Sequence, residues 1–172
     1  MILDAGPVIG LHELGVWGAF LERYEVVLPQ SVYEDEALFH STDVDSGFSQ
    51  PIDLAAQVAA GQLAVACAHF SAVGRVSSRF NVAVELHAGK LEALALLTLD
   101  EAFTEHVFCS ADGAAIEAAC MVGLSDRRES LEKLLAMAGL GRAVSGRFSK
   151  GFMDRHKREG GARAVTGFGL AD

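Results

Sequence analysis

Residues 1–10, MILDAGPVIG, place an apolar stretch directly before one carboxylate and a Gly-Pro turn. Met1 to Leu3 predict the start of a buried strand. Gly6-Pro7 cannot easily continue that strand, because proline lacks a donor for the ladder and glycine favours a turn. Asp4 therefore stands where a strand ends, and in open α/β sheets ligands bind at that edge. Asp4 is a candidate site residue; the alternative is that it caps the following helix.

The same pattern recurs in FCSADGAAIEAACMVG, residues 108–123. Asp112 follows an apolar strand expected at 106–109 and precedes a helix expected at 114–121. Because parallel strands end at one edge of a sheet, Asp4 and Asp112 are expected to lie close together. Two like charges at short distance cost free energy unless a cation neutralises them or one of them takes a proton. The repeated strand end therefore predicts a shared acidic pocket.

Strands and helices alternate along the rest of the chain. Further strands are expected at 24–28 and 63–66, and residues 40–50 are expected to form a loop. Helices are expected at 8–20, 32–39, 52–60, 72–86, 91–99 and within 130–140. This alternation predicts an α/β fold of three layers, a central parallel sheet flanked by helices on both faces.

Two other segments supply acids that could complete the pocket. In SVYEDEALF, residues 31–39, Asp35 and Glu36 share the helical face of Val32, whereas Glu34 should point away. The alternative for this acidic run is a solvated helix surface. In GKLEALALL, residues 89–97, Glu92 is the sole charge of the apolar run 91–99, which is costly without a partner. Its alternative role is a first-turn acid favoured by the helix dipole.

The order ILDAGPVI, VLPQSVYEDEALF, AGKLEALALL, FCSADGAAIEAACMVGL resembles the PIN-domain family, metal-dependent ribonucleases that include toxins of toxin–antitoxin pairs. The resemblance covers about residues 1–140. It implies that Asp4, Glu36 or Asp35, Glu92 and Asp112 form the acidic site, with Asp4, Glu36, Glu92 and Asp112 as metal ligands. A PIN-type site would use Mg²⁺ or Mn²⁺ to hydrolyse a phosphodiester bond, and these hard cations suit carboxylate oxygens.

Two residues depart from the family pattern. Ser110 replaces the usual threonine and keeps the hydroxyl, which could orient a water or a phosphate oxygen in the catalytic site. Lys90 stands where many relatives carry a glutamate, and its amine could take the place of a metal as counter-charge. The alternative function is therefore a catalytically degenerate PIN-like protein that acts as a binding or interaction module.

Charge is segregated along the chain, although the whole protein carries a net charge of −9. Residues 1–138 have a balance of −13, whereas residues 139–172 have a balance of +4. The family resemblance implies a PIN-like nuclease domain at 1–140, and the change of charge predicts a basic C-terminal extension at 141–172. This extension predicts a mobile arm that binds the phosphates of single-stranded RNA, with an ordinary solvated tail as the alternative. The family resemblance adds an antitoxin and a second copy of the chain, as a homodimer, to the expected partners.

Composition excludes several other classes of protein. With 172 residues and 51% hydrophobic residues, the chain fits one soluble domain with a substantial core. It has neither a run of about 18 apolar residues nor the features of a signal peptide, so a cytoplasmic protein without membrane contact is expected. AGPVIG is not the glycine-rich loop of a dinucleotide site. The three cysteines are expected to be reduced core thiols, and the six histidines show no metal-ligand spacing.

Overall fold

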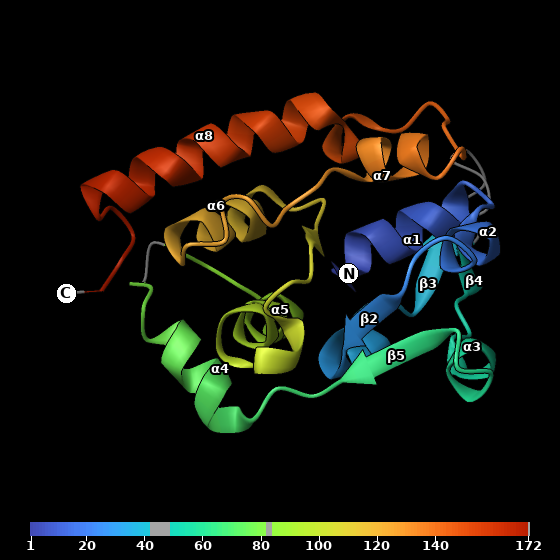
Figure 1. Ribbon diagram of the computed structural model, residues 1–172, viewed down its shortest axis with the longest axis horizontal. Coiled ribbons are helices and arrows are strands. Elements are labelled where there is room, and N and C mark those ends of the chain that lie inside the picture. Colours follow the sequence, from blue (N-terminus) through green and yellow to red (C-terminus); the bar gives the residue numbers. More distant parts are fainter. Residues whose placement is uncertain (42–48, 82–83, 172) are drawn as a thin grey trace.

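The computed structural model describes residues 1–41, 49–81 and 84–171, and its centre is a parallel sheet of four strands (Figure 1). The strand order is β5-β2-β1-β6, with bounds Leu63–Ala66, Val26–Pro29, Ile2–Leu3 and Phe108–Cys109. Ile2 is in register with Val27 on one side and with Phe108 on the other. The prediction that the first strand and the strand before Asp112 are neighbours is therefore confirmed, and their carboxyl ends lie at one edge.

Side chains alternate between the two faces of the sheet, as strands buried on both faces require. Ile2, Val27 and Phe108 pack into one core, whereas Leu3 and Cys109 pack into the other. The first core lies under α4 (Phe70–Ser77), α5 (Ala88–Leu99) and α6 (Gly113–Met121). The second lies under α1 (Ala5–Glu13), α2 (Trp17–Leu21) and α7 (Leu131–Met137). The predicted α/β architecture of a parallel sheet flanked by helices is thus confirmed.

Several elements are shorter than the sequence predicts. The helix expected at 8–20 is split into α1 and α2 by Gly15, whose φ of 65° favours glycine. The acidic helix expected at 32–39 is the π-helix Val32–Glu36, and the helix expected at 52–60 is α3 (Ala55–Ala59). The loop expected at 40–50 includes the end of β3 (Phe39–Ser41) and the start of β4 (Ser49–Pro51), which pair antiparallel. Its residues 42–48 lie outside the described residues.

The helix expected at 72–86 ends early because its backbone pairs with the C-terminal segment. α4 stops at Ser77, and Asn81 then donates its backbone N–H to the carbonyl of Gly169. Arg79 accepts a backbone hydrogen bond from Ala171 in the same place. These partners are far away in the sequence, so local periodicity carries no sign of them.

The basic C-terminal segment is packed on the domain, so the expected mobile arm is not confirmed. After the short 3₁₀ turn Gly146–Phe148, residues Lys150–Thr166 form α8, which lies along α6 at the top of Figure 1. A Cβ atom at Gly160 would approach the backbone of Glu117 to 2.6 Å, and one at Gly10 would lie 2.6 Å from the ring of Phe148. Glycine at these two positions therefore allows the segment to contact α6 and α1 closely.

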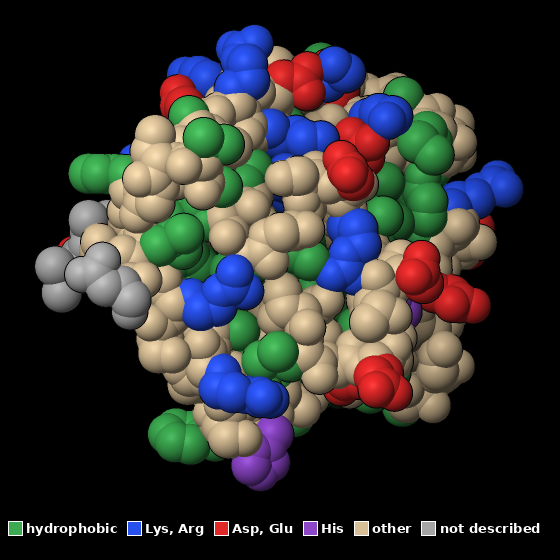
Figure 2. All heavy atoms as spheres, turned by 60° about the vertical axis from the view of Figure 1, so that its left-hand side comes forward, with side chains coloured by type: hydrophobic (Ala, Val, Ile, Leu, Met, Phe, Trp, Pro, Cys, Tyr) green, Lys and Arg blue, Asp and Glu red, His purple; other side chains and the backbone are tan. Residues whose placement is uncertain are grey.

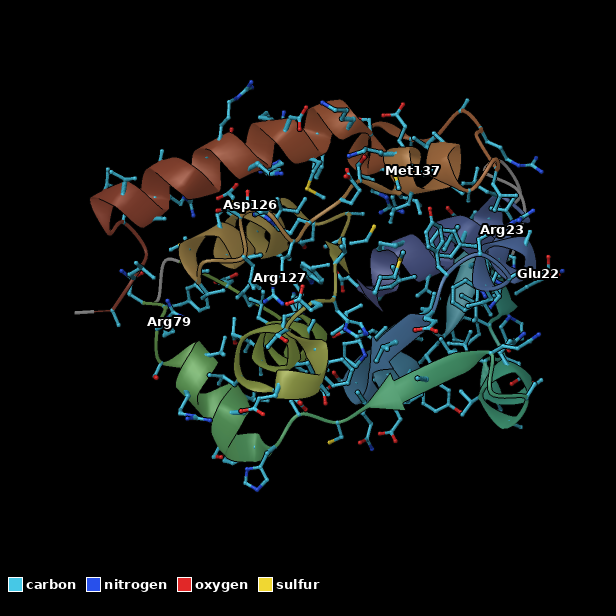
Figure 3. All side chains as sticks on the ribbon, viewed as in Figure 1. Glu22, Arg23, Arg79, Asp126, Arg127 and Met137 are labelled. Atoms are coloured by element: carbon cyan, nitrogen blue, oxygen red, sulfur yellow. The ribbon has the colours of Figure 1, made fainter. Side chains whose placement is uncertain are left out.

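Arginine side chains also tie loops to the helices. Arg127 lies between α6 and α5 in Figure 3 and donates hydrogen bonds to the carbonyls of Leu97, Phe103 and Thr104. It thereby satisfies carbonyls at the C-terminal end of α5 and in the following 3₁₀ turn Glu101–Phe103. Among residues 1–41, 49–81 and 84–171, the helices lack the length and apolar character that crossing a bilayer requires.

The cysteine prediction is right for two positions and wrong for one. Cys109 and Cys120 are buried, whereas Cys67 is exposed, and all three are free thiols. Cys67 follows the last residue of β5, at the point where the chain leaves the sheet. Its apolar neighbours in the sequence therefore do not bury it.

Candidate active site at the carboxyl edge of the sheet

Asp4 and Asp112 are joined by the hydroxyl of Ser110. Ser110 Oγ donates to Asp4 Oδ2 at 2.7 Å and accepts the backbone N–H of Asp112 at 3.1 Å. Asp4 Oδ1 accepts the backbone N–H of Ala5 at 2.9 Å, and Asp112 Oδ1 accepts that of Ala115 at 3.0 Å. Each aspartate therefore caps a helix, α1 or α6, as in the alternative considered for Asp4. Capping leaves both carboxylates at the same edge of the sheet, because the two helices begin where neighbouring strands end.

Glu36 reaches this edge from the π-helix. Its Oε1 accepts the backbone N–H of Gly89 at 3.0 Å, at the start of α5. A Cβ atom at position 89 would lie 2.8 Å from both oxygens of this carboxylate, so glycine there makes the contact sterically allowed. Asp35 is exposed and Glu36 is half-buried, which distinguishes the two acids that the sequence left as alternatives.

A small pocket of about 160 Å³ collects three of the predicted acids. Its lining consists of Asp4, Ala5, Gly6, Glu36, Lys90, Ala111, Asp112 and Arg147. Lys90 is mostly buried, with 11% of its side chain exposed, and its Nζ lies 3.5 Å from Asp112 Oδ2. The pocket therefore combines three carboxylates with two cations, so part of its negative charge is compensated by the chain itself.

Glu92 is absent from the described lining of this pocket and serves the neighbouring strands. Its Oε2 accepts hydrogen bonds from the backbone N–H and the hydroxyl of Ser31, at 2.9 and 2.5 Å. Its Oε1 accepts the backbone N–H of Ala68 at 3.1 Å. Ser31 follows β2 and Ala68 follows β5, so one buried carboxylate links the ends of two strands. These three donors supply the partners that an acid in an apolar helix requires.

Potential metal ligands also lie close together in a different group. Among the described residues, one set of at least three His, Cys, Asp or Glu side chains has ligand atoms within 4.8 Å of one another: Glu117, His156 and Glu159. This set could hold a metal ion. Sequence reasoning missed it because Glu117 is 39 residues from His156. The spacing of His156 and Glu159, three residues apart on a helix, was the available signal.

Covalent chemistry by the buried thiol at this edge is disfavoured. Cys109 immediately precedes Ser110, and burial, reinforced by the charges of Asp4 and Glu129, raises the pKa of its thiol. The thiol is therefore held protonated, whereas nucleophilic cysteines act as thiolates.

A larger pocket lies near the opposite edge of the sheet. It has a volume of about 460 Å³, and Met1 and Val107, which flank the amino ends of β1 and β6, are among its lining residues. Met137 of α7, labelled in Figure 3, lines the same pocket and is 67% exposed. In open α/β sheets the carboxyl edge is where ligands bind. We therefore regard the smaller acidic pocket as the candidate active site.

Comparison of the chain with protein-family models, curated proteins and solved structures finds no match. The resemblance to PIN domains stays a prediction from the sequence motifs. The features that bear on the function of the protein are its parallel sheet and the acidic pocket at the carboxyl edge of that sheet.

Proposed function

We propose that this protein is a metal-dependent endoribonuclease of the PIN type. The observation that carries the proposal is the convergence of Asp4, Glu36 and Asp112, from three separate elements, on one pocket at the carboxyl edge of a parallel sheet. Ser110 supports this arrangement through its hydrogen bonds to Asp4 and to the backbone of Asp112. The order of these residues along the chain is also the order of the family motifs.

The donor set of the pocket fits Mg²⁺ or Mn²⁺. Both ions prefer carboxylate oxygens, and Mg²⁺ retains several waters, so Asp4, Glu36 and Asp112 are sufficient to hold one. An ion held there would lower the pKa of a bound water and so supply a nucleophile for phosphodiester hydrolysis. Glu92 is not required as a ligand in this proposal. Its carboxylate already accepts three hydrogen bonds that fix the neighbouring strand ends.

The chain's own residues then act on the substrate. Lys90 would leave Asp112 and contact a phosphate oxygen. Once Asp112 binds a cation, its 3.5 Å ion pair with Lys90 is weaker than a charge-assisted hydrogen bond from Lys90 to the phosphate. Arg147 at the rim would bind a neighbouring phosphate. Lys and Arg side chains, with acids between them, also lie over α8 at the top of Figure 2. Single-stranded RNA would approach along this helix, since the rest of the chain is strongly acidic.

The proposal is tested by cleavage of a fluorogenic single-stranded RNA after removal of metals and addition of Mn²⁺ or Mg²⁺. Wild-type protein should cleave, and Asp112→Asn and Glu36→Gln should lower kcat far more than they raise KM. Asp35→Asn is the matched control, because Asp35 is exposed and lies beside Glu36 outside the pocket. Equal activity of Glu36→Gln and Asp35→Asn, with both proteins folded by circular dichroism, would contradict the proposed site.

The ion pair between Lys90 and Asp112 specifically favours a second function, a degenerate PIN-like binding module. In that case the amine serves as the permanent counter-charge of the pocket. Wild-type protein would then bind RNA or a protein partner without cleaving RNA, and Lys90→Glu would gain both Mn²⁺ binding and cleavage. An active wild-type protein eliminates this alternative. The family resemblance also leads us to propose an antitoxin and a second copy of the chain as partners, which co-purification and analytical ultracentrifugation would test.

A further inference from the structure

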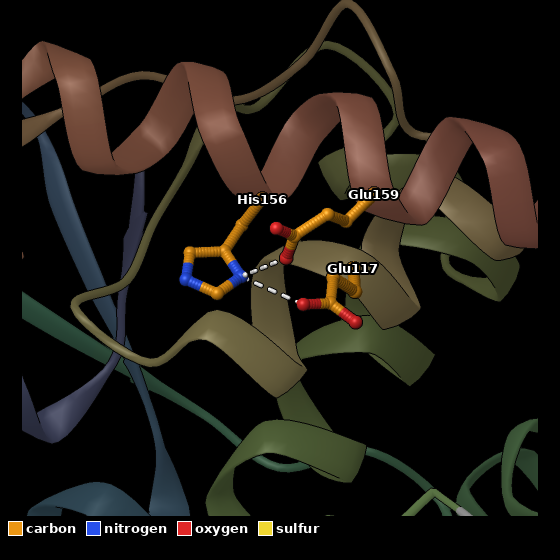
Figure 4. Close-up of side chains that lie close together, drawn as sticks. All are labelled: Glu117, His156 and Glu159. Atoms are coloured by element: carbon orange, nitrogen blue, oxygen red, sulfur yellow. Dashed lines mark hydrogen bonds and ion pairs between the residues drawn. The ribbon is translucent and has the colours of Figure 1, made fainter.

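A histidine and two glutamates meet between α6 and α8 (Figure 4), and none of the three lines the carboxyl-edge pocket. His156 Nδ1 lies 2.6 Å from Glu117 Oε1 and 3.1 Å from Glu159 Oε2. The side chain of Glu117 is 9% exposed and that of His156 is 14% exposed, whereas that of Glu159 is half exposed. The three ligand atoms therefore face one another at a partly enclosed position that solvent ions can reach from the side of Glu159.

Two arginines contact the atoms of Glu117 and His156 that point away from the cluster. The nitrogen and oxygens that could bind a metal are left facing one another. Arg163 Nη1 lies 3.2 Å from Glu117 Oε2, on the side opposite to the oxygen that faces His156. Arg155 Nη2 lies 3.0 Å from His156 Nε2. Because a guanidinium can only donate, this contact makes Nε2 an acceptor and assigns the proton of a neutral ring to Nδ1. An ion bound at Nδ1 would leave the proton of the neutral ring on Nε2, so the exposed Arg155 would release Nε2, whose N–H would then donate to water.

Glycine contacts hold the histidine in place before any ion binds. A Cβ atom at Gly113 would lie 2.4 Å from the ring of His156, so the ring packs directly on the start of α6. The close approach of Gly160 to the backbone of Glu117 fixes the same pair of helices one turn further along α8. The ligand atoms are thus supplied by two helices whose separation is set by packing, which lowers the ordering cost of binding.

We propose that Glu117, His156 and Glu159 bind a first-row divalent transition ion such as Zn²⁺, which clamps α8 onto α6. One imidazole nitrogen and two carboxylate oxygens suit Zn²⁺ or Co²⁺, whereas Mg²⁺ prefers oxygen ligands alone. Two carboxylates balance the charge of the ion, and three protein ligands leave a coordination position for water. The site does not rest on the proposed nuclease function, because its three ligands are not among the residues that line the carboxyl-edge pocket.

The proposal is tested by titrating metal-free protein with Co²⁺, whose visible absorption reports its ligands, and with Zn²⁺ by calorimetry. Wild-type protein should bind one ion at this site, apart from any ion held in the carboxyl-edge pocket, and Glu159→Gln should weaken that binding by roughly tenfold or more. Asp154→Asn is the matched control, since it removes a carboxylate from the same helix whose ion pair is with Lys150. Asp112→Asn removes a proposed ligand of the carboxyl-edge pocket and should retain the ion that Glu159→Gln loses, which separates the two sites.

Several outcomes would overturn the metal site. One is an unchanged Co²⁺ spectrum on titration of wild-type protein, and another is equal affinity of Glu159→Gln and Asp154→Asn. His156→Gln should also lose the ion, and circular dichroism checks its fold. If this variant does not fold, Glu159→Gln decides the question, because its half-exposed side chain carries little of the packing. A bound ion should in addition slow hydrogen exchange in residues 150–166, and unchanged exchange would refute the clamp.

Discussion

Replacement of Gly160 by alanine tests whether α8 is an integral layer of the domain. The new methyl group would lie 2.6 Å from Glu117 Cα and 2.7 Å from the Glu117 carbonyl oxygen, closer than real Cβ atoms approach. Two backbone atoms of α6 form the contact, so α8 must move away from α6. Overpacking of this kind costs about 1–3 kcal/mol. Gly161→Ala is the matched control, because a methyl group there would have no described heavy atom within 4 Å.

Both substitutions replace glycine by alanine inside the same helix, so the helix-propensity gain of about 0.5–1 kcal/mol is common to the two variants. Their difference therefore isolates the clash. We expect Gly160→Ala to be less stable than Gly161→Ala by about 1–3 kcal/mol in urea unfolding. For a protein of this size this corresponds to a difference of about 2–12 °C in Tm. Equal stability of the two variants would refute the claim that α8 packs tightly on α6.

Three further substitutions test other parts of the structure. Glu92→Gln should lower the free energy of unfolding by about 1–3 kcal/mol, because an amide cannot accept all three hydrogen bonds; an unchanged urea midpoint would argue against the link between strand ends. Phe148→Ala should lower the free energy of unfolding by about 3–5 kcal/mol, because it empties the space that the ring fills over Gly10. A urea midpoint near that of wild type would show that the ring does not contribute to packing. His12 has its pKa lowered from 6.5 to about 4, first by burial and then by His40. The folded state therefore binds its proton less readily than the unfolded state, so this contribution to stability is complete above pH 6.5 and is lost as the pH falls toward 4. His12→Phe should make the urea midpoint less dependent on pH in that window, and an unchanged dependence would contradict the assignment.

The parallel sheet and the meeting of Asp4 with Asp112 could be predicted from the sequence, because both depend on local signals. A short apolar strand followed by an acid and a glycine specifies a strand end without reference to distant residues. Parallel pairing then places the two ends at one edge. The choice between Asp35 and Glu36 could not be made in this way, because it depends on how the π-helix rotates the two side chains.

The roles of Glu92 and of the C-terminal segment could not be predicted, since their partners are distant in the sequence. Ser31 is 61 residues from Glu92 and supplies two of its three hydrogen bonds. The basic composition of residues 139–172 indicated a solvated arm, yet Gly160 packs against the backbone of Glu117. The many charged side chains of α8 give this segment its basic composition, whereas its buried residues are Met153 and Gly160.

The most direct test of the proposed nuclease site is the position of Mn²⁺ in crystals of the protein, measured by anomalous diffraction. We expect an anomalous peak among the carboxylates of Asp4, Glu36 and Asp112, with the amine of Lys90 moved away from Asp112. A structure in Mn²⁺ with no peak in this pocket, and with Lys90 still paired to Asp112, would contradict it.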